Sequence, residues 1–259
     1  MNTETSQTPE LAIVIPAKNE ENFLPKLLAS LSRQDYLRLQ RTKVFVADAG
    51  STDNTVAAAL AFSPELDVTI IRGGLPSVAR NNGARQSQSL YILFLDADVE
   101  LNDPTLIGRA MRSMRGQQLH CATVSVACTS TRLADRLLYG ASNLVQHISC
   151  WVRPFGTGMF LLVDRARFEE LGGFSESALF AEDYDFTRKI SLLRFSVVRG
   201  QVYTSNRRFQ KTGHLRVIWL FLRTALNTNN PSHFNQSHGY WNQQTQPKAA
   251  RRRYFSRSD

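Results

Sequence analysis

Apolar runs and amphipathic stretches alternate along the first part of the chain. The apolar runs have the length of strands, and the stretches between them repeat apolar residues at the spacing of a helix face. The expected strands are residues 11–16, 43–48, 68–72 and 89–95, and the expected helices are 21–33, 54–62 and a segment within 73–88. Because strands that alternate with helices form parallel βαβ units, the pattern predicts an α/β fold with a mainly parallel sheet and flanking helices.

The second half of the chain is less regular. A long helix is expected at 132–152, a Gly-rich segment and then a strand at 154–163, an acidic turn opening a helix at 178–192, and a late strand at 195–203. One stripe of the long helix is apolar: Leu133, Leu137, Ala141, Leu144, Ile148 and Val152. Such a stripe packs in a core or contacts a membrane, and we favour the core.

Shifts in composition divide the chain into four parts. We expect a disordered N-terminus at 1–9, one α/β domain at 10–213, an amphipathic helix at 214–226 and a polar, basic, flexible tail at 227–259. In the amphipathic helix, arginines flank Trp and Phe, a pattern typical of a helix at a membrane interface.

Charge and cysteine content indicate the kind of partner and the cellular compartment of the protein. The 259-residue chain has a formal net charge of +9, which favours anionic partners such as lipid head groups, nucleic acid or phosphate-bearing substrates. Cys121, Cys128 and Cys150 lack metal-ligand spacing and read as reduced thiols, and the polar N-terminus does not resemble a signal peptide. We expect a cytoplasmic protein, with peripheral binding to an anionic membrane surface at the inner face of the cell membrane as a hypothesis.

Carboxylates follow the fourth expected strand, in the segment LDADVE. Asp96 and Asp98 stand at alternate positions, so their side chains share a face at the exit of a buried strand. Hard carboxylate oxygens suit Mg²⁺ or Mn²⁺, which complete their coordination with substrate phosphates. The alternative is a strand-to-helix turn capped by Asn102 and Asp103, which leaves Asp96 and Asp98 unexplained.

Three other polar segments have both a structural and a functional interpretation. IPAKNEE and ADAGSTDNT lie at two neighbouring strand exits. They are either capped turns or segments that bind the base and ribose of a nucleotide. Arg80, in VARNNGAR, either reaches a base or phosphate or is a solvated helix residue. AEDYDF is either an ordinary acidic helix start or the location of a general base.

Together and in this order, these segments resemble family 2 glycosyltransferases of the GT-A fold. The resemblance spans about residues 10–210 and rests on IPAKNEE, ADAGSTDNT, ARNNGA, LDADVE, GTGMFLLV with GGFSE, and AEDYDF. It implies a Rossmann-like domain with a mixed, mainly parallel sheet that binds a nucleotide-diphosphate sugar and a divalent cation. The implied reaction is transfer of the sugar to a hydroxyl with inversion at the anomeric carbon.

The resemblance also implies roles for residues on the donor side. Pro16 and Glu20 would face the nucleoside, Asp48 would hydrogen-bond the base, and Arg80 would lie beside the base. Ala49 stands where the family has a second Asp, so any role of that carboxylate is absent here.

Further roles concern the metal, the base and the diphosphate. Asp98 would bind the metal directly, Asp96 would contact ribose or metal, and Glu100 would add a metal ligand. Asp183 would be the catalytic base, with Glu182 supporting it. From the residues themselves, Arg207 and Arg208 are candidates to clamp the diphosphate.

The acceptor and two rival functions stay open. The donor would be UDP- or GDP-linked, and the acceptor hydroxyl would belong to a lipid, a lipid-linked group or a saccharide. A nucleotidyltransferase also holds Mg²⁺ with carboxylates, but IPAKNEE lacks the glycines of a phosphate loop. A basic membrane- or RNA-binding protein would explain the tail but not the acidic segments, and we expect no specific nucleic-acid partner.

Overall fold

The computed structural model describes residues 8–36, 41–205, 207, 213, 219–220, 223–224 and 234–236. Arg208 lies outside these residues. So do most of the segments expected to form a disordered N-terminus at 1–9, an amphipathic helix at 214–226 and a flexible tail at 227–259. Within the last segment, Phe234 is instead buried, and its carbonyl accepts a hydrogen bond from the Leu179 amide at 2.8 Å.

A mixed sheet forms the centre of the fold, with the strand order β3-β2-β1-β4-β7-β6-β8-β5. The strands are β1 (Leu11–Ala17), β2 (Lys43–Asp48), β3 (Asp67–Arg72), β4 (Tyr91–Phe94), β5 (Val99–Glu100), β6 (Cys121–Cys128), β7 (Leu161–Asp164) and β8 (Phe195–Thr204). β1 to β4 are mutually parallel, whereas β7 runs antiparallel to both of its neighbours, β4 and β6. The expected α/β fold with a mixed sheet and flanking helices is confirmed.

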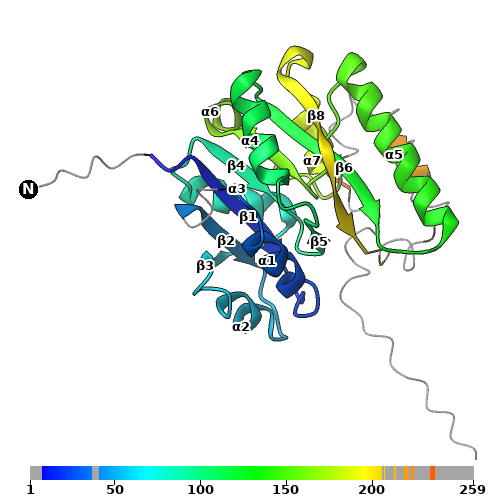
Figure 1. Ribbon diagram of the computed structural model, residues 1–259. Coiled ribbons are helices and arrows are strands. Elements are labelled where there is room, and N and C mark those ends of the chain that lie inside the picture. The colour runs from blue at the N-terminus through cyan, green and yellow to red at the C-terminus, as the bar shows by residue number, and fades with distance from the viewer. Residues whose placement is uncertain are drawn as a thin grey trace, which may run out of the picture.

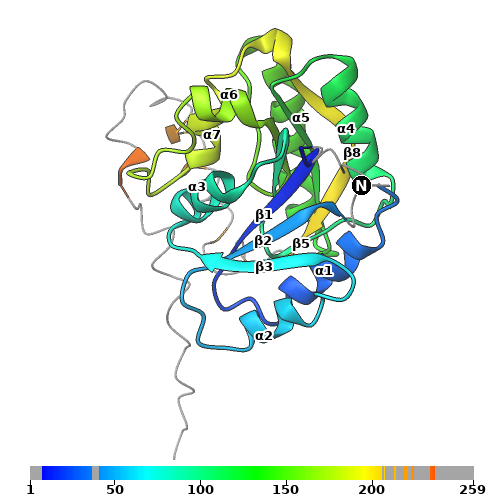
Figure 2. The same ribbon diagram turned by 90° about the vertical axis from the view of Figure 1, so that its left-hand side faces the viewer.

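Helices cover both faces of this sheet (Figures 1 and 2). They are α1 (Leu24–Ser32), α2 (Thr55–Leu60), α3 (Pro76–Gln86), α4 (Leu106–Gly116), α5 (Leu133–Val152), α6 (Arg165–Glu170), α7 (Glu182–Thr187) and the 3-10 helix η2 (Leu192–Arg194). Alternate residues of β1 pack on opposite faces of the sheet, because successive side chains of a strand point to opposite sides. Ile13 packs with α1 and α4, and Val14 packs with α3, α6 and α7.

Helix α3 packs closely against β1, and this contact sets the position of α3 beside the carboxyl ends of the strands, where the site lies. A Cβ at Gly83 would lie 2.4 Å from a methyl carbon of Val14, so only glycine allows this approach. The carboxyl ends of β1, β2 and β4 then meet beside the N-terminal half of α3, as expected for ligand sites in parallel sheets.

Two expectations from the pattern differ from the structure. β6 follows the segment CATVSVAC, which was not expected to form a strand. The apolar stripe of α5 was expected in the core, and this is wrong: Leu133, Leu137, Leu144 and Ile148 are all more than half exposed. The inward face of α5 is instead polar. Among the helices that the structure describes, none is long and apolar enough to cross a membrane.

Candidate active site

The loops after β1 and β2 are held together by side-chain hydrogen bonds. The Asn19 amide donates to Ser51 Oγ at 2.9 Å, the Thr52 amide donates to Asn19 Oδ1 at 2.8 Å, and the Glu20 amide donates to Thr55 Oγ1 at 2.8 Å. Asn19 adopts a left-handed conformation with φ of 55°, which places Glu20 at the start of the next turn. The two loops therefore form one polar rim.

The Asp48 carboxylate closes the turn after β2. Its Oδ2 accepts hydrogen bonds from the amides of Gly50 and Ser51, both at 3.1 Å, and its Oδ1 accepts one from Ser51 Oγ at 2.5 Å. Pro16 is half-buried near the end of β1, in register with Ala47 of β2. The structure thus gives Asp48 a turn-forming role, and the implied contact with a base stays a prediction.

At the exit of β4, partly exposed carboxylates alternate with buried apolar residues. Leu95, Ala97 and Val99 are buried, whereas the alternate residues Asp96, Asp98 and Glu100 are partly exposed. Glu100 lies in the short strand β5, opposite Tyr203 of β8. The chain therefore turns its carboxylates away from the core and toward the rim.

A buried arginine connects two of the acidic segments. Arg80, on α3, donates through Nη2 to Asp96 Oδ1 at 2.6 Å and through Nη1 to Glu182 Oε1 at 2.5 Å. Its guanidinium also lies 5.5 Å from the centroid of the Phe174 ring. Arg80 is only 3% exposed, so it is a structural bridge between the two carboxylates and not a solvated helix residue.

Burial and neighbouring charges set the protonation of this bridge. Burial acts to lower the pKa of the Arg80 guanidinium, but the Asp96, Glu182 and Asp183 carboxylates raise that pKa overall. Burial raises the pKa of Glu182, while Arg80 opposes the rise. The arginine therefore stays charged, and it is the counter-ion that keeps carboxylates in this buried corner.

The predicted base, Asp183, is held in place by backbone groups. Its Oδ2 accepts a hydrogen bond from the Gly158 amide at 2.9 Å, and its Oδ1 accepts one from the Tyr184 amide at 2.8 Å. Ala181, directly before Glu182 and Asp183, has a left-handed φ of 50°, which is strained for a residue with a Cβ. This kink aims Glu182 inward and leaves Asp183 half-buried at the rim.

The sequence interpretation missed two residues next to Asp183. Gly158 has no room for a Cβ, which would lie 2.1 Å from Arg80 Nη2. Thr157 Oγ1 is buried and lacks a hydrogen-bond partner among the described residues. The segment GTG marks a close backbone approach in the sequence, but it does not indicate which side chain approaches.

Arg207 pairs with carboxylates from two strand exits. It donates to both oxygens of Glu20, at 2.9 and 3.0 Å, and to Asp98 Oδ2 at 3.2 Å. Its guanidinium lies 4.5 Å from the centroid of the Phe23 ring. Burial raises the pKa of Glu20, Arg207 opposes this rise, and the nearby Asp98 and Asp96 carboxylates add to it. Arg207 thus joins the segment after β1 to the segment after β4 in one electrostatic network.

Carboxylates outnumber arginines in this network. Its acidic members are Glu20, Asp96, Asp98, Glu182 and Asp183, and its basic members are Arg80 and Arg207. No group of three His, Cys, Asp or Glu residues in the described part of the chain is arranged to hold a metal alone. The donor set nevertheless fits Mg²⁺ or Mn²⁺, because these ions take few protein carboxylates and complete their coordination with water and phosphate oxygens.

Fold and site are those of an α/β protein with a polar, charged rim at its strand exits, and the sequence places the chain in a family. Residues 12–172, more than half of the chain, match the family Glycosyl transferase family 2, and the chain belongs to this family. It is 34% identical over 120 residues to the 4,4'-diaponeurosporenoate glycosyltransferase of Staphylococcus haemolyticus. That match covers 44% of the chain but only 31% of the relative.

Solved structures show the same GT-A fold. The mannosyltransferase PcManGT from Pyrobaculum calidifontis, in complex with GDP-Man and Mn²⁺, superposes with a TM-score of 0.66 at 18% identity, covering 91% of this chain and 69% of that one. TarS from S. aureus, residues 1–349, in complex with UDP-GlcNAc, superposes with a TM-score of 0.61 at 19% identity, covering 76% and 59%. These identities are too low to transfer residue roles.

The Arg80 bridge leads to a prediction about stability. Arg80→Met keeps a flexible, unbranched side chain about as long as the aliphatic part of arginine but leaves Asp96 and Glu182 without their cation, so we expect the free energy of unfolding to fall by about 3–5 kcal/mol. Urea denaturation followed by far-ultraviolet circular dichroism measures this change. Arg85→Met is the matched control on the same helix: its ion pair with Glu176 is exposed, so the loss should stay below about 1 kcal/mol. Equal losses in both variants would contradict the bridge.

Contact between Gly158 and Arg80 leads to a second prediction. In Gly158→Ala the new methyl group displaces a guanidinium that two ion pairs hold, so we expect a loss of about 1–3 kcal/mol in the free energy of unfolding. Gly140→Ala is the control, because its Cβ meets nothing within 4 Å in the middle of α5. It should stabilise the protein by up to about 1 kcal/mol. A neutral Gly158→Ala would mean that Arg80 moves freely.

Proposed function

We propose that this protein is an inverting glycosyltransferase that moves a sugar from a UDP- or GDP-linked donor to an acceptor hydroxyl. One observation carries the proposal: the buried Arg80 joins Asp96, at the exit of β4, to Glu182, the neighbour of Asp183. A cluster suited to a diphosphate and its cation therefore lies beside a separate, partly exposed carboxylate. These are the minimum parts of a single in-line displacement at a sugar carbon.

Asp183 is the proposed general base. The acceptor oxygen forms a bond to the anomeric carbon as the bond between that carbon and the diphosphate breaks, and the hydroxyl proton passes to the Asp183 carboxylate. Hydrogen bonds from the Gly158 and Tyr184 amides fix the carboxylate for this transfer. Glu182 acts through Arg80, because it is buried and paired and does not face the rim.

A divalent cation belongs to the proposed donor site. Asp98 would hold Mg²⁺ or Mn²⁺, with Asp96 and Glu100 as further candidate ligands, and the ion would supply charge stabilisation for the diphosphate leaving group. Glu20 and Pro16 would border the nucleoside, with Asp48 toward the base. Arg207 would turn from Asp98 to the diphosphate, with Arg208 beside it. The Mn²⁺ in the complex of the similar mannosyltransferase supports this assignment.

The proposal also covers the acceptor. We propose a hydroxyl on a lipid or lipid-linked group, with a free saccharide as the alternative, and peripheral binding of the protein to the cytoplasmic face of a membrane. A net charge of +9 supports attraction to anionic lipid.

Donor binding gives the first test of this function. In the presence of Mn²⁺, UDP or GDP should raise the melting temperature, and the rise should grow with nucleotide concentration because the ligand binds only the folded state. Asp98→Asn should abolish the part of the rise that depends on Mn²⁺. The exposed Asp67→Asn, at the opposite end of the strands, is the matched control and should behave as wild type. No rise with any nucleoside diphosphate would remove the proposal of a nucleotide donor.

Removal of the base gives the second test. Asp183→Asn should lower kcat by about 10²–10⁴-fold, because the amide cannot accept the hydroxyl proton. The dissociation constant for nucleoside diphosphate, measured by calorimetry, should change little. Asp67→Asn again serves as the control for the loss of a carboxylate. Unchanged turnover in Asp183→Asn would exclude Asp183 as the base, whereas weakened nucleotide binding would assign it to the donor site.

A further inference from the structure

Helix α5 attaches to the sheet through polar groups. Asn143 donates to the Val126 carbonyl and accepts from the Val126 amide, both at 2.9 Å, so it pairs with the backbone of β6. Gln146 donates to Thr123 Oγ1 at 3.0 Å, and both side chains are buried. The inward face of this helix is therefore held by directional hydrogen bonds, with Tyr139 as its large side chain in the apolar core.

The outward face of α5 is apolar. Its exposed large side chains range from 51% exposed for Ile148 to 85% for Trp151. The set comprises Leu133, Leu137, Leu144, Val145, Ile148, Trp151 and Val152. A surface helix normally presents the reverse polarity, so this contiguous stripe marks an interaction surface.

Charge on this surface has one sign. Among residues 132–152, the exposed ionisable side chains are Arg132, Arg136 and His147. The helix has a single carboxylate, Asp135, and it is buried. A stripe of Leu, Ile and Trp bordered by arginine, without exposed carboxylates, is complementary to the apolar interior and anionic head groups of a lipid bilayer.

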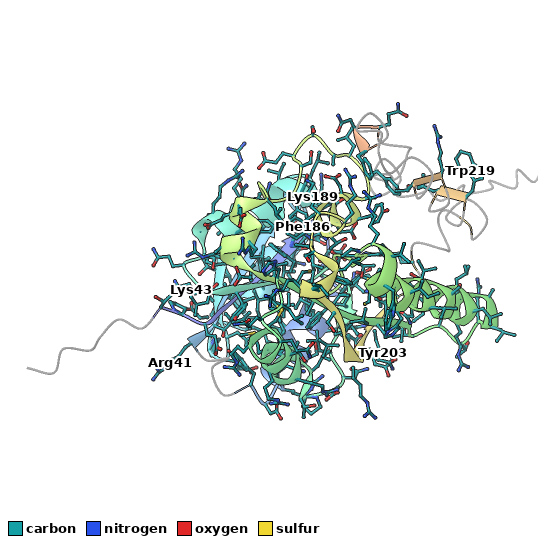
Figure 3. The ribbon with its side chains drawn as sticks, turned by 90° about the horizontal axis from the view of Figure 1, so that it is seen from above. Arg41, Lys43, Phe186, Lys189, Tyr203 and Trp219 are labelled. Atoms are coloured by element: carbon teal, nitrogen blue, oxygen red, sulfur yellow. The ribbon has the colours of Figure 1, made fainter. Side chains whose placement is uncertain are left out.

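The position of α5 suits a flat partner. Figure 1 shows α5 at one side of the molecule, outside β6 and β8, and the large apolar side chains of its outward face are exposed. Figure 3 shows Trp219 at this same end of the molecule, and Trp219 and Leu193 are both exposed. Arg223 lies 5.2 Å from the Trp219 ring centroid.

We propose that α5 is a membrane-docking helix that lies in the plane of an anionic phospholipid surface. Its outward apolar side chains enter the head-group region, and Arg132 and Arg136 contact lipid phosphates. Packing of a second copy of this chain on the same stripe is less favourable, because α5 offers no exposed carboxylate to pair with Arg132 and Arg136 of the other copy.

Docking through α5 would also orient the site, and this consequence rests on the proposed function. The C-terminal end of α5 leads into the loop where Phe155 donates to Ser149 Oγ at 3.0 Å and Gly158 donates to Asp183. A surface that holds α5 therefore brings the rim near Asp183 close to the bilayer. An acceptor anchored by an apolar tail would present its hydroxyl there.

Flotation of the full-length protein with phosphatidylcholine vesicles, with and without phosphatidylglycerol, tests the docking surface. Wild type should float with the anionic vesicles, and Leu144→Glu/Ile148→Glu should lower the bound fraction at least about tenfold by placing carboxylates in the contact. Arg132→Gln/Arg136→Gln should weaken binding by about fivefold for each arginine, with a smaller salt dependence. Leu60→Glu/Leu90→Glu, a matched change at exposed leucines outside α5, should lose much less binding.

Three outcomes would overturn the proposal. They are absence of wild-type flotation, equal loss in the α5 variant and the Leu60/Leu90 control, and conversion of a dimer to a monomer by the α5 variant in sedimentation equilibrium without a change in flotation. The melting temperature of each variant confirms that it folds. Nucleotide binding is measured without vesicles, so a protein that floats through α5 but binds no nucleotide would retain the docking surface and lose the proposed function.

Discussion

The buried pairing of Arg80 with Asp96 and Glu182 is the interaction on which the site depends. A carboxylate at the end of a core strand and another at a buried helix start are both unfavourable without a cation, and one guanidinium serves both. The arginine in turn requires Gly158, because any side chain there would occupy its place. Since the Gly158 amide also holds Asp183, the geometry of the proposed base follows from the same contact.

An excess of carboxylates remains after both arginines are paired. Arg207 neutralises Glu20 and Asp98 only in part, and the raised pKa of Glu20 reflects its burial together with the nearby Asp98 and Asp96 charges. A rim with this charge balance favours a cation and would repel a bare diphosphate. A divalent ion bound together with a diphosphate offsets the excess negative charge of the carboxylates and removes the repulsion between these carboxylates and the diphosphate. The donor and the ion therefore act as one ligand.

The local pattern of hydrophobic and polar residues predicted most strands of the sheet and the outward orientation of the acidic residues. The strands at 11–17 and 43–48 follow from short apolar runs, and the partial exposure of Asp96 and Asp98 follows from alternation alone. The Arg80–Glu182 pair joins residues 102 positions apart, and no local pattern indicates such a partner. The residues alone allowed Arg80 to reach a base or phosphate or to be solvated; the structure shows it paired with Asp96 and Glu182, and a contact with the base stays a prediction. The family resemblance supplied the roles of Asp98 and Asp183, which the residues alone left open.

Helix α5 shows why periodicity cannot assign a core. The spacing of Leu133, Leu137, Leu144 and Ile148 predicts a helix with one apolar face. The same spacing is compatible with that face pointing toward the sheet or away from it. The orientation is decided by Asn143 and Gln146, which find partners on β6 that lie far away in the sequence. Turning the helix over would bury leucine against these polar groups and leave the Val126 amide and carbonyl without partners. The hydrogen bonds to the sheet therefore keep the apolar face of α5 outward. This face can be buried only by a binding partner, which we propose is the membrane surface.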